Sequence, residues 1–163
     1  MAETVQGLRV QVYVTGSVNG AAGDGRMPVD FTYDQTFTDG TAAAQVGYIY
    51  QKLARSLAGT NETLDLDGET DFQGVAMSGN NNVKLLLLHN NNTTPGVTLT
   101  MGGGDFVGPL VDTSDLGRTG ANGLILMVNP TDGWPITAST GDGLKIANST
   151  TGTYDIILAG DNS

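Results

Sequence analysis

Residues 80–92 read N-N-N-V-K-L-L-L-L-H-N-N-N, from Asn80 to Asn92, and this stretch decides the fold class. Asparagine tolerates left-handed backbone conformations and bonds its own backbone, so each Asn triplet predicts a turn. The apolar run at 83–88 between the triplets is typical of a strand that is buried on both faces, and we expect it at the centre of a sheet. Residues 124–128, L-I-L-M-V, have the same character and the same expected place.

Two segments near the N-terminus alternate with the period of half-buried strands. Val10, Val12 and Val14 alternate within residues 8–14, and mostly aromatic residues occupy every second position of residues 29–37. The Gly-rich stretch 16–25 between them is expected to be a long loop. The residues on the two predicted faces are Val10, Val12, Val14, Val29, Phe31, Tyr33, Gln35 and Phe37.

Residues 42–57 fit two secondary structures. Val46, Ile49, Tyr50, Leu53 and Leu57 have helical spacing, but the same stretch also alternates as a strand would. We favour the strand. Further short strands are expected at residues 97–101, 136–138, 144–146 and 154–158.

Together these segments predict an all-β chain, an antiparallel β-sandwich or jelly-roll-like fold of roughly nine to ten short strands. We expect one domain over residues 1–163, in which residues 1–40 form an N-terminal strand or arm region and residues 41–163 form the sandwich body. Charged helix-forming residues are scarce and glycine, with 24 residues, falls between the apolar runs, which argues against an all-α fold.

The charge balance excludes several kinds of partner. Seven Lys and Arg residues face seventeen Asp and Glu residues, for a formal net charge of −10. Such a surface repels phosphate backbones, so no direct nucleic-acid binding is expected. No apolar run reaches 18 residues and no secretory signal is recognised, so no membrane partner is expected. The chain has no cysteine, so burial and backbone pairing must stabilise it.

Candidate catalytic groups are few. His89 is the single histidine and ends an apolar strand, and no serine lies in a G-x-S-x-G motif, so a nucleophile–His–acid triad is not expected. Residues 102–108 read G-G-G-D-F-V-G but lack the lysine of a phosphate-binding loop, and no cofactor is expected. Several aspartates precede glycines in predicted turns, among them Asp132 and Asp142.

One acidic run could hold a divalent cation. Asp65, Asp67, Glu69 and Asp71 alternate along the chain, and hard cations prefer several carboxylate oxygens from one short segment. The glycine and the final glutamate of an EF-hand loop are not in the required places. The competing interpretation is a strand that carries these acids on one solvated face, and we favour it over a metal site.

Trp134 lies in a predicted loop, D-G-W-P, before a strand. A loop tryptophan can bind sugar, contact another subunit or anchor its own loop. We favour burial, against this chain or a neighbouring subunit. Tyr13 and Tyr48 are further candidates for subunit or partner contact.

Most of the chain, over residues 45–160, resembles small structural proteins of tailed bacteriophages. The resemblance lies in strand and turn motifs rather than in catalytic ones. The matching stretches are residues 55–59 (R-S-L-A-G), 63–66 (T-L-D-L), 83–90 (V-K-L-L-L-L-H-N), 97–103 (V-T-L-T-M-G-G), 123–128 (G-L-I-L-M-V), 132–138 (D-G-W-P-I-T-A), 144–148 (L-K-I-A-N) and 154–160 (Y-D-I-I-L-A-G).

This resemblance implies a jelly-roll-like virion protein without enzymatic activity. The expected function is that of a capsid cement or decoration protein that binds and stabilises the assembled shell, with the major capsid protein or other virion proteins as partners. It also implies a homo-oligomer, with a trimer expected, assembled in the host cytoplasm. The alternative is a tail-fibre, tail-tip or head-fibre domain that contacts host carbohydrate through Trp134 and Tyr154. A third class, a carbohydrate-active β-sandwich enzyme, would require a pair of aspartates in a cleft.

Overall fold

The computed structural model describes residues 5–19, 26–57, 59–70, 77, 81–106, 108–110 and 112–161. Twelve strands in three sheets make up the regular structure of these residues, which contain no helix. The expected all-β, sandwich-like fold is confirmed. The strand count exceeds the expected nine to ten, partly because β3 (Gln45–Val46) and β10 (Trp134–Pro135) are strands of only 2 residues each. Since the described residues form no helix, they include none long and apolar enough to cross a membrane.

Two sheets pack face to face as the sandwich body. One has the order β10-β6-β12-β4, with β9 paired to β6, and the other has the order β5-β11-β7-β8. Large apolar and aromatic side chains from both sheets fill the space between them, including Tyr50, Leu86, Leu99 and Ile146. The other body strands are β4 (Tyr48–Ser56), β5 (Asn61–Asp65), β6 (Asn82–Asn90), β7 (Leu99–Gly102), β8 (Leu116–Thr119), β9 (Leu124–Val128), β11 (Gly143–Asn148) and β12 (Thr153–Asp161).

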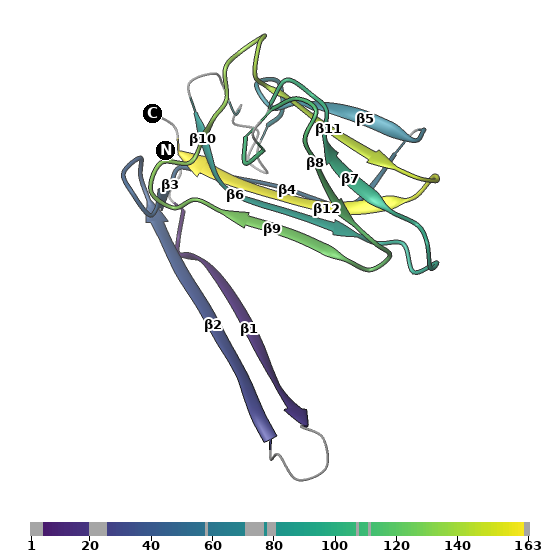
Figure 1. Cartoon of the computed structure of the whole chain (residues 1–163). Helices are drawn as coiled ribbons and strands as arrows, with labels where there is room; N and C mark the ends of the chain where they lie inside the picture. Colours follow the sequence, from purple (N-terminus) through teal and green to yellow (C-terminus); the bar gives the residue numbers. More distant parts are fainter. Residues whose placement is uncertain are drawn as a thin grey trace.

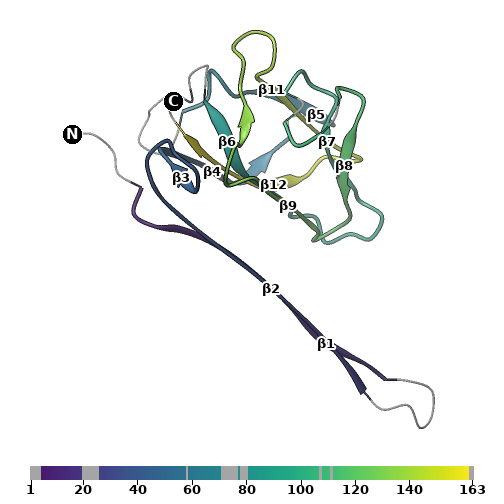
Figure 2. The same cartoon turned by 60° about the vertical axis from the view of Figure 1, so that its left-hand side comes forward.

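The third sheet is an arm that projects from the body. β1 (Leu8–Asn19) and β2 (Arg26–Asp39) form a long antiparallel hairpin, which we call the arm. At its root, β3 pairs in parallel with Thr38 and Asp39. Figures 1 and 2 show β1 and β2 running away from the sandwich, so that their far ends lie beyond the body strands. At about 3.3 Å per residue, the 12 residues of β1 span ~40 Å.

Several expected boundaries differ from the observed ones. Residues 16–19 continue β1, so the first four residues of the expected loop at 16–25 are strand; residues 20–25 lie outside the described part. Residues 42–57 contain β3 and β4, as favoured over a helix. The strand expected at 136–138 is instead a tight turn closed by a bridge between Thr137 and Gly141. β8 was not expected, because L-G-R-T has neither a clear alternation nor an apolar run.

The two fully apolar strands occupy different places in their sheet. β6 is central, between β12 on one side and β9 and β10 on the other, as expected. The central position expected for β9 is wrong, because β9 pairs with β6 alone among the described strands. Both faces of β9 are apolar because each packs against a different part of the chain. Ile125 and Met127 pack on the sandwich core, whereas Leu126 and Val128 pack with the root of the arm.

Candidate functional site

One face of the arm is apolar. In an antiparallel pair, residues directly opposite each other lie on the same face. Val12 is opposite Tyr33 and Val14 is opposite Phe31, so β1 supplies valines and β2 supplies aromatic rings to a common surface. We call this surface the apolar face of the arm; its members are Leu8, Val10, Val12, Val14, Val29, Phe31, Tyr33, Gln35 and Phe37.

The opposite face of the arm is polar. Arg9 forms an ion pair with Asp34, in which Arg9 Nε donates to Asp34 Oδ1 at 2.8 Å. The hydrogen bond from the Arg9 guanidinium holds the pKa of Asp34 below its ordinary value. Gln11 Nε2 donates to the Tyr13 hydroxyl at 2.7 Å. Arg9, Asp30 and Asp34, the charged residues within 8–14 and 29–37, therefore all lie away from the apolar face.

Only the root of the apolar face is covered. Phe37 is fully buried, and Leu8 and Val10 pack with it in a second core beside the sheet. Farther out, Val14 is 48 % exposed, and Val29 and Phe31 are 42 % and 55 % exposed. A two-stranded hairpin is marginally stable in water unless its apolar face packs against something. The described chain therefore covers Val14, Val29 and Phe31 only in part, and their apolar side chains remain accessible.

The arm root packs on the outer face of the five-stranded sheet, which is the face turned away from the sandwich core. Cross-strand pairing arranges its side chains in rows. The row that packs with the arm root contains Val128, Leu85, Ala159 and Ile49. The next row contains Leu126, Leu87 and Ile157. The last row contains Leu124, His89 and Asp155. The outer face therefore changes from apolar to polar with distance from the arm root.

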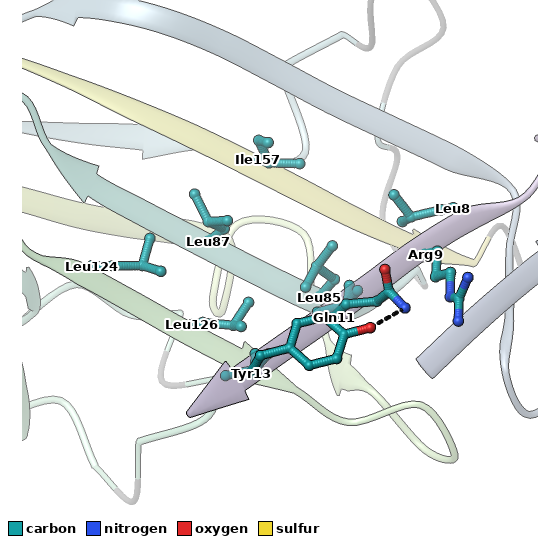
Figure 3. A pocket seen from close by; sticks show the side chains of 11 residues that line it. Leu8, Arg9, Gln11, Tyr13, Leu85, Leu87, Leu124, Leu126 and Ile157 are labelled. Carbon is teal, nitrogen blue, oxygen red and sulfur yellow. Dashed lines mark hydrogen bonds between the residues drawn. The ribbon is translucent and has the colours of Figure 1, made fainter. Parts of the chain in front are cut away.

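A groove of about 460 Å³ runs between β1 and this outer face. Figure 3 shows Leu87, Leu124 and Leu126 on the sheet side and Tyr13 and Gln11 on the β1 side. A second groove of about 250 Å³ lies on the β2 side, lined by Val12, Phe31, Tyr33, Leu126 and Val128. The arm thus overhangs the sheet with an apolar groove along each of its strands, a geometry suited to packing against another apolar surface.

A buried cation holds the arm at its root. Lys84 Nζ lies 2.8 Å from Asp161 Oδ2 and donates to the carbonyl oxygens of Ala42 at 2.7 Å and Gln45 at 3.0 Å. Ala42 and Gln45 belong to the segment that joins β2 to β4. The Asp161 carboxylate also accepts a hydrogen bond from the backbone nitrogen of Asn82. Lys84 therefore ties the end of the arm to two strands of the body.

A β-bulge directs Lys84 toward the arm. Gly160 pairs with Val83 and Ala159 pairs with Leu85, so Lys84 is an extra residue on β6. Bulges re-aim side chains by breaking the strict alternation of faces. Here the bulge lets Val83 join the sandwich core while Lys84 reaches the loop carbonyls.

The acidic run does not form the expected strand face. β5 ends at Asp65, and the chain then turns: Asp65 Oδ1 accepts from the backbone nitrogen of Gly68 at 3.0 Å. Asp67 lies within this turn, and Glu69 extends to Arg55 at 3.4 Å. Asp71 lies outside the described residues. Within the described part of the chain, no three His, Cys, Asp or Glu side chains gather as a metal site would require.

The three aromatic contact candidates have different environments. Tyr13 is 61 % exposed on the polar face of the arm. Trp134 is half-buried and packs against the sandwich core, which accords with an anchoring role in its loop. Tyr48 is 1 % exposed and belongs to the sandwich core, and its contact with a partner stays a prediction. Tyr154, the second aromatic of the sugar-binding alternative, is fully buried.

Two polar clusters lie elsewhere on the body. His89 contacts Asp155 at 3.2 Å and Asn122 at 3.3 Å; neither neighbour carries a hydroxyl or thiol, so these contacts do not form a nucleophile–His–acid triad. In the second cluster, Tyr154 donates to Glu62 at 2.5 Å, and Glu62 also pairs with Arg55 at 3.1 Å. Burial raises the pKa of Tyr154. This second cluster joins β4 and β12 of one sheet to β5 of the other.

Sequence reasoning identified the alternating faces of the arm but not their exposure. The valines of β1 and the aromatics of β2 were recognisable as two strand faces, but their pairing into one long hairpin was not predicted. The role of Lys84 at the arm root was not recognisable from the sequence, because a single lysine in an apolar run looks like an ordinary strand residue. Comparisons with protein-family models, curated proteins and solved structures found no match to this chain.

Proposed function

We propose that this chain is a structural assembly protein, a binding protein rather than an enzyme, and that its arm contacts neighbouring proteins in the assembly. The observation that carries the proposal is the half-covered apolar face, on which Val14, Val29 and Phe31 remain exposed. Contiguous exposed apolar surface marks an interaction site in soluble proteins. The buried Lys84–Asp161 pair at the root supports the same function, because an anchored arm presents this surface in a defined direction.

The setting we propose is the capsid of a tailed bacteriophage, where the chain would act as a cement or decoration protein in the virion. The sequence resemblance over residues 45–160 supports the proposed capsid setting. A net charge of −10 suits a protein that must stay soluble at high concentration before it docks. The major capsid protein and further copies of the chain are the proposed partners, and the trimer remains the count that the resemblance implies.

The arm offers two kinds of contact for such an assembly. Its apolar face can pack on a neighbour, and its strand edges can accept another strand. β1 pairs with β2 alone among the described strands, so its other edge has free backbone groups. Unpaired edges are common sites of strand addition between proteins. An arm of ~40 Å can reach well beyond the body to make either contact.

Co-sedimentation with empty shells tests the proposal. Purified chain is mixed with assembled shells of the phage that encodes it, and the pelleted fraction and the melting temperature of the shells are measured. We expect the wild-type chain to pellet with the shells and to raise their melting temperature. Phe31→Asp should lose most of this binding, because it places a charge on the apolar face.

Thr32→Asp is the matched control, because it adds the same charge at the adjacent position on the polar face of the arm. It should bind as the wild type does. Failure of the wild-type chain to bind shells would overturn the capsid setting, and equal binding by Phe31→Asp and Thr32→Asp would overturn the role of the arm.

A further inference from the structure

The ring of His89 lies between two hydrogen-bond acceptors, and we propose that its protonation is a pH-sensitive switch for the turn at residues 120–123, which joins β8 to β9. His89 Nδ1 lies 3.2 Å from Asp155 Oδ2, and His89 Nε2 lies 3.3 Å from Asn122 Oδ1. A neutral imidazole carries one N–H group, whereas the protonated ring carries two. The protonated ring can therefore donate to both neighbours at once, and the neutral ring cannot.

The surroundings of the ring are simple. Among the described residues, Asp155 on β12 is the one titratable side chain in contact with His89. β9 places the uncharged Leu124 opposite His89, and the turn supplies the uncharged Asn122. β4 contributes the backbone nitrogen of Ala54, which donates to Asp155. The inference goes beyond the proposed function and does not depend on it, because it concerns contacts within one chain.

Asp155 is a fixed anion in this cluster. Its Oδ1 accepts hydrogen bonds from the backbone nitrogen of Ala54 and from Asn91 Nδ2, each at 2.7 Å. Burial alone would raise the pKa of Asp155, but the hydrogen bonds from Ala54, Asn91 and His89 hold that pKa below its ordinary value. Histidine is the side chain whose charge ordinarily changes between about pH 5 and pH 8. The proton that is gained or lost in this range is therefore the one on His89.

Two non-glycine residues with positive φ angles are joined through the cluster. Ala54 has a φ of 52° and Asn122 a φ of 54°, in the left-handed region that residues other than glycine seldom occupy. Hydrogen bonds connect Ala54 to Asn122 by way of Asp155 and His89. Backbone in sparsely populated regions persists where surrounding contacts hold it, and it is common at switch regions. The link through His89 is such a contact for the turn that contains Asn122.

Loss of the proton should break the contact with Asn122 rather than the contact with Asp155. A carboxylate is a stronger acceptor than an amide oxygen, so the remaining N–H group stays on His89 Nδ1. His89 Nε2 then presents a lone pair to Asn122 Oδ1, and two acceptors repel each other. The side chain of Asn122 must turn away, and the turn loses one of its attachments to the sheet.

The turn should loosen without unfolding, because backbone hydrogen bonds also hold it. The Asn122 nitrogen donates to the Asn92 carbonyl oxygen at 2.7 Å, and the Asn90 nitrogen donates to that of Gly123 at 2.9 Å. Leu124 follows the turn directly; it is 54 % exposed and lines the groove beside β1. Protonation of His89 therefore acts on one end of this groove.

NMR of the full chain tests the switch, because His89 is the single histidine and its ring signals need no further assignment. Long-range proton–nitrogen correlation spectra show which ring nitrogens carry protons. We expect protons on both nitrogens at about pH 5 and on Nδ1 alone at about pH 8. A proton on Nε2 alone at the higher pH would overturn the proposal, because Asp155 and not Asn122 would then lack a donor.

Hydrogen exchange measures the response of the turn. After correction for the intrinsic rate, the Asn122 N–H group should exchange at least about fivefold faster at about pH 8 than at about pH 6. The Gly141 N–H group is the matched control, since it donates to Thr137 at 2.8 Å in another turn, and its corrected rate should not change. The same pH dependence at both groups, or faster exchange of Asn122 at the lower pH, would contradict the switch.

His89→Phe separates the switch from general effects of pH. Phenylalanine keeps an aromatic ring but donates to neither neighbour, so the Asn122 N–H group should exchange at the fast rate throughout this pH range. Wild-type pH dependence in the variant would overturn the proposal; if circular dichroism shows that the variant is unfolded, the position of the ring proton in the wild-type chain decides. These experiments do not involve shells, so a failed switch leaves the proposed function intact, and failed shell binding leaves the switch intact.

Discussion

Lys84 Nζ lies 2.8 Å from Asp161 Oδ2, and the two side chains are 1 % and 4 % exposed. The two residues come from neighbouring strands of the body, yet the other contacts of the ammonium group are carbonyl oxygens at the root of the arm. A buried charge is tolerated only when it is paired and hydrogen-bonded. The pair therefore links the stability of the sheet to the placement of the arm.

Replacing Lys84 tests this link. Lys84→Met removes the cation and leaves the Asp161 carboxylate and the loop carbonyls without it, and loss of one partner of a buried ion pair costs about 3–5 kcal/mol. Urea denaturation measures the free energy of unfolding. Lys52→Met is the control: Lys52 is exposed, 5.8 Å from the centre of the Tyr50 ring, and its loss should cost under ~1 kcal/mol. Equal effects of the two substitutions would contradict the role of Lys84.

Loss of the hydroxyl group should affect the free energy of unfolding differently at two buried tyrosines. The Tyr48 hydroxyl has no hydrogen-bond partner among the described residues, so Tyr48→Phe should leave stability unchanged or raise it by up to ~1 kcal/mol. The Tyr154 hydroxyl donates to Glu62, so Tyr154→Phe should lower stability by about 1.5–3 kcal/mol. Thermal and urea unfolding of both variants measures the difference. A more stable Tyr154→Phe than Tyr48→Phe would disprove this account of the two hydroxyls.

Alkaline pH should destabilise the fold. Burial raises the pKa values of Tyr48, Tyr50 and Tyr154 above 10.0. Because the folded pKa values exceed the unfolded ones, the stabilisation is complete below pH 10 and decreases as pH rises above it, where the unfolded phenols ionise. Urea unfolding from pH 8 to pH 11, with tyrosinate absorbance recorded in parallel, should show stability falling above pH 10. Full tyrosine ionisation in a protein that is still folded would contradict the burial of these phenols.

A single glycine makes close packing possible beside Tyr48. A Cβ atom at Gly160 would collide with the carbonyl oxygen of Asn82 and with the Tyr48 hydroxyl. The carbonyl belongs to the backbone of the paired strand and cannot move aside, so Gly160→Ala should cost about 3 kcal/mol or more. Gly120→Ala is the control, since its Cβ would have no neighbour within 4 Å. Similar melting temperatures for the two variants would show that the strands are not this closely packed.

The fold class could be predicted from the sequence because local patterns and tertiary structure agree over most strands. The apolar run at 83–88 between Asn triplets forms the central strand β6, and the alternation in residues 8–14 and 29–37 gives the two faces of the arm. The same reasoning misplaced β9. An apolar strand can be central, or it can be an edge strand whose outer face is covered by another part of the chain, and local sequence does not separate the two.

The site was only partly predictable. Tyr13 was expected at a contact and lies exposed on the arm, but the exposure of Val14, Val29 and Phe31 depends on how far the body extends along the arm. The direction of Lys84 depends on a bulge that arises from the pairing of β6 with β12. The acids from Asp65 onward alternate in sequence, yet Asp65 bonds to the Gly68 nitrogen and closes a turn instead. Each of these features arises from contacts between segments distant in sequence or from local side-chain capping.

The central claim is that the apolar face of the arm is an assembly surface on a phage particle. Electron cryo-microscopy of the intact virion tests it most directly, because it locates the chain and shows what covers Val14, Val29 and Phe31. We predict density for the chain on the outer surface of the capsid, with these three side chains packed against protein. A virion without this chain on its capsid, or one in which the arm extends into solvent with the three side chains uncovered, would contradict the claim.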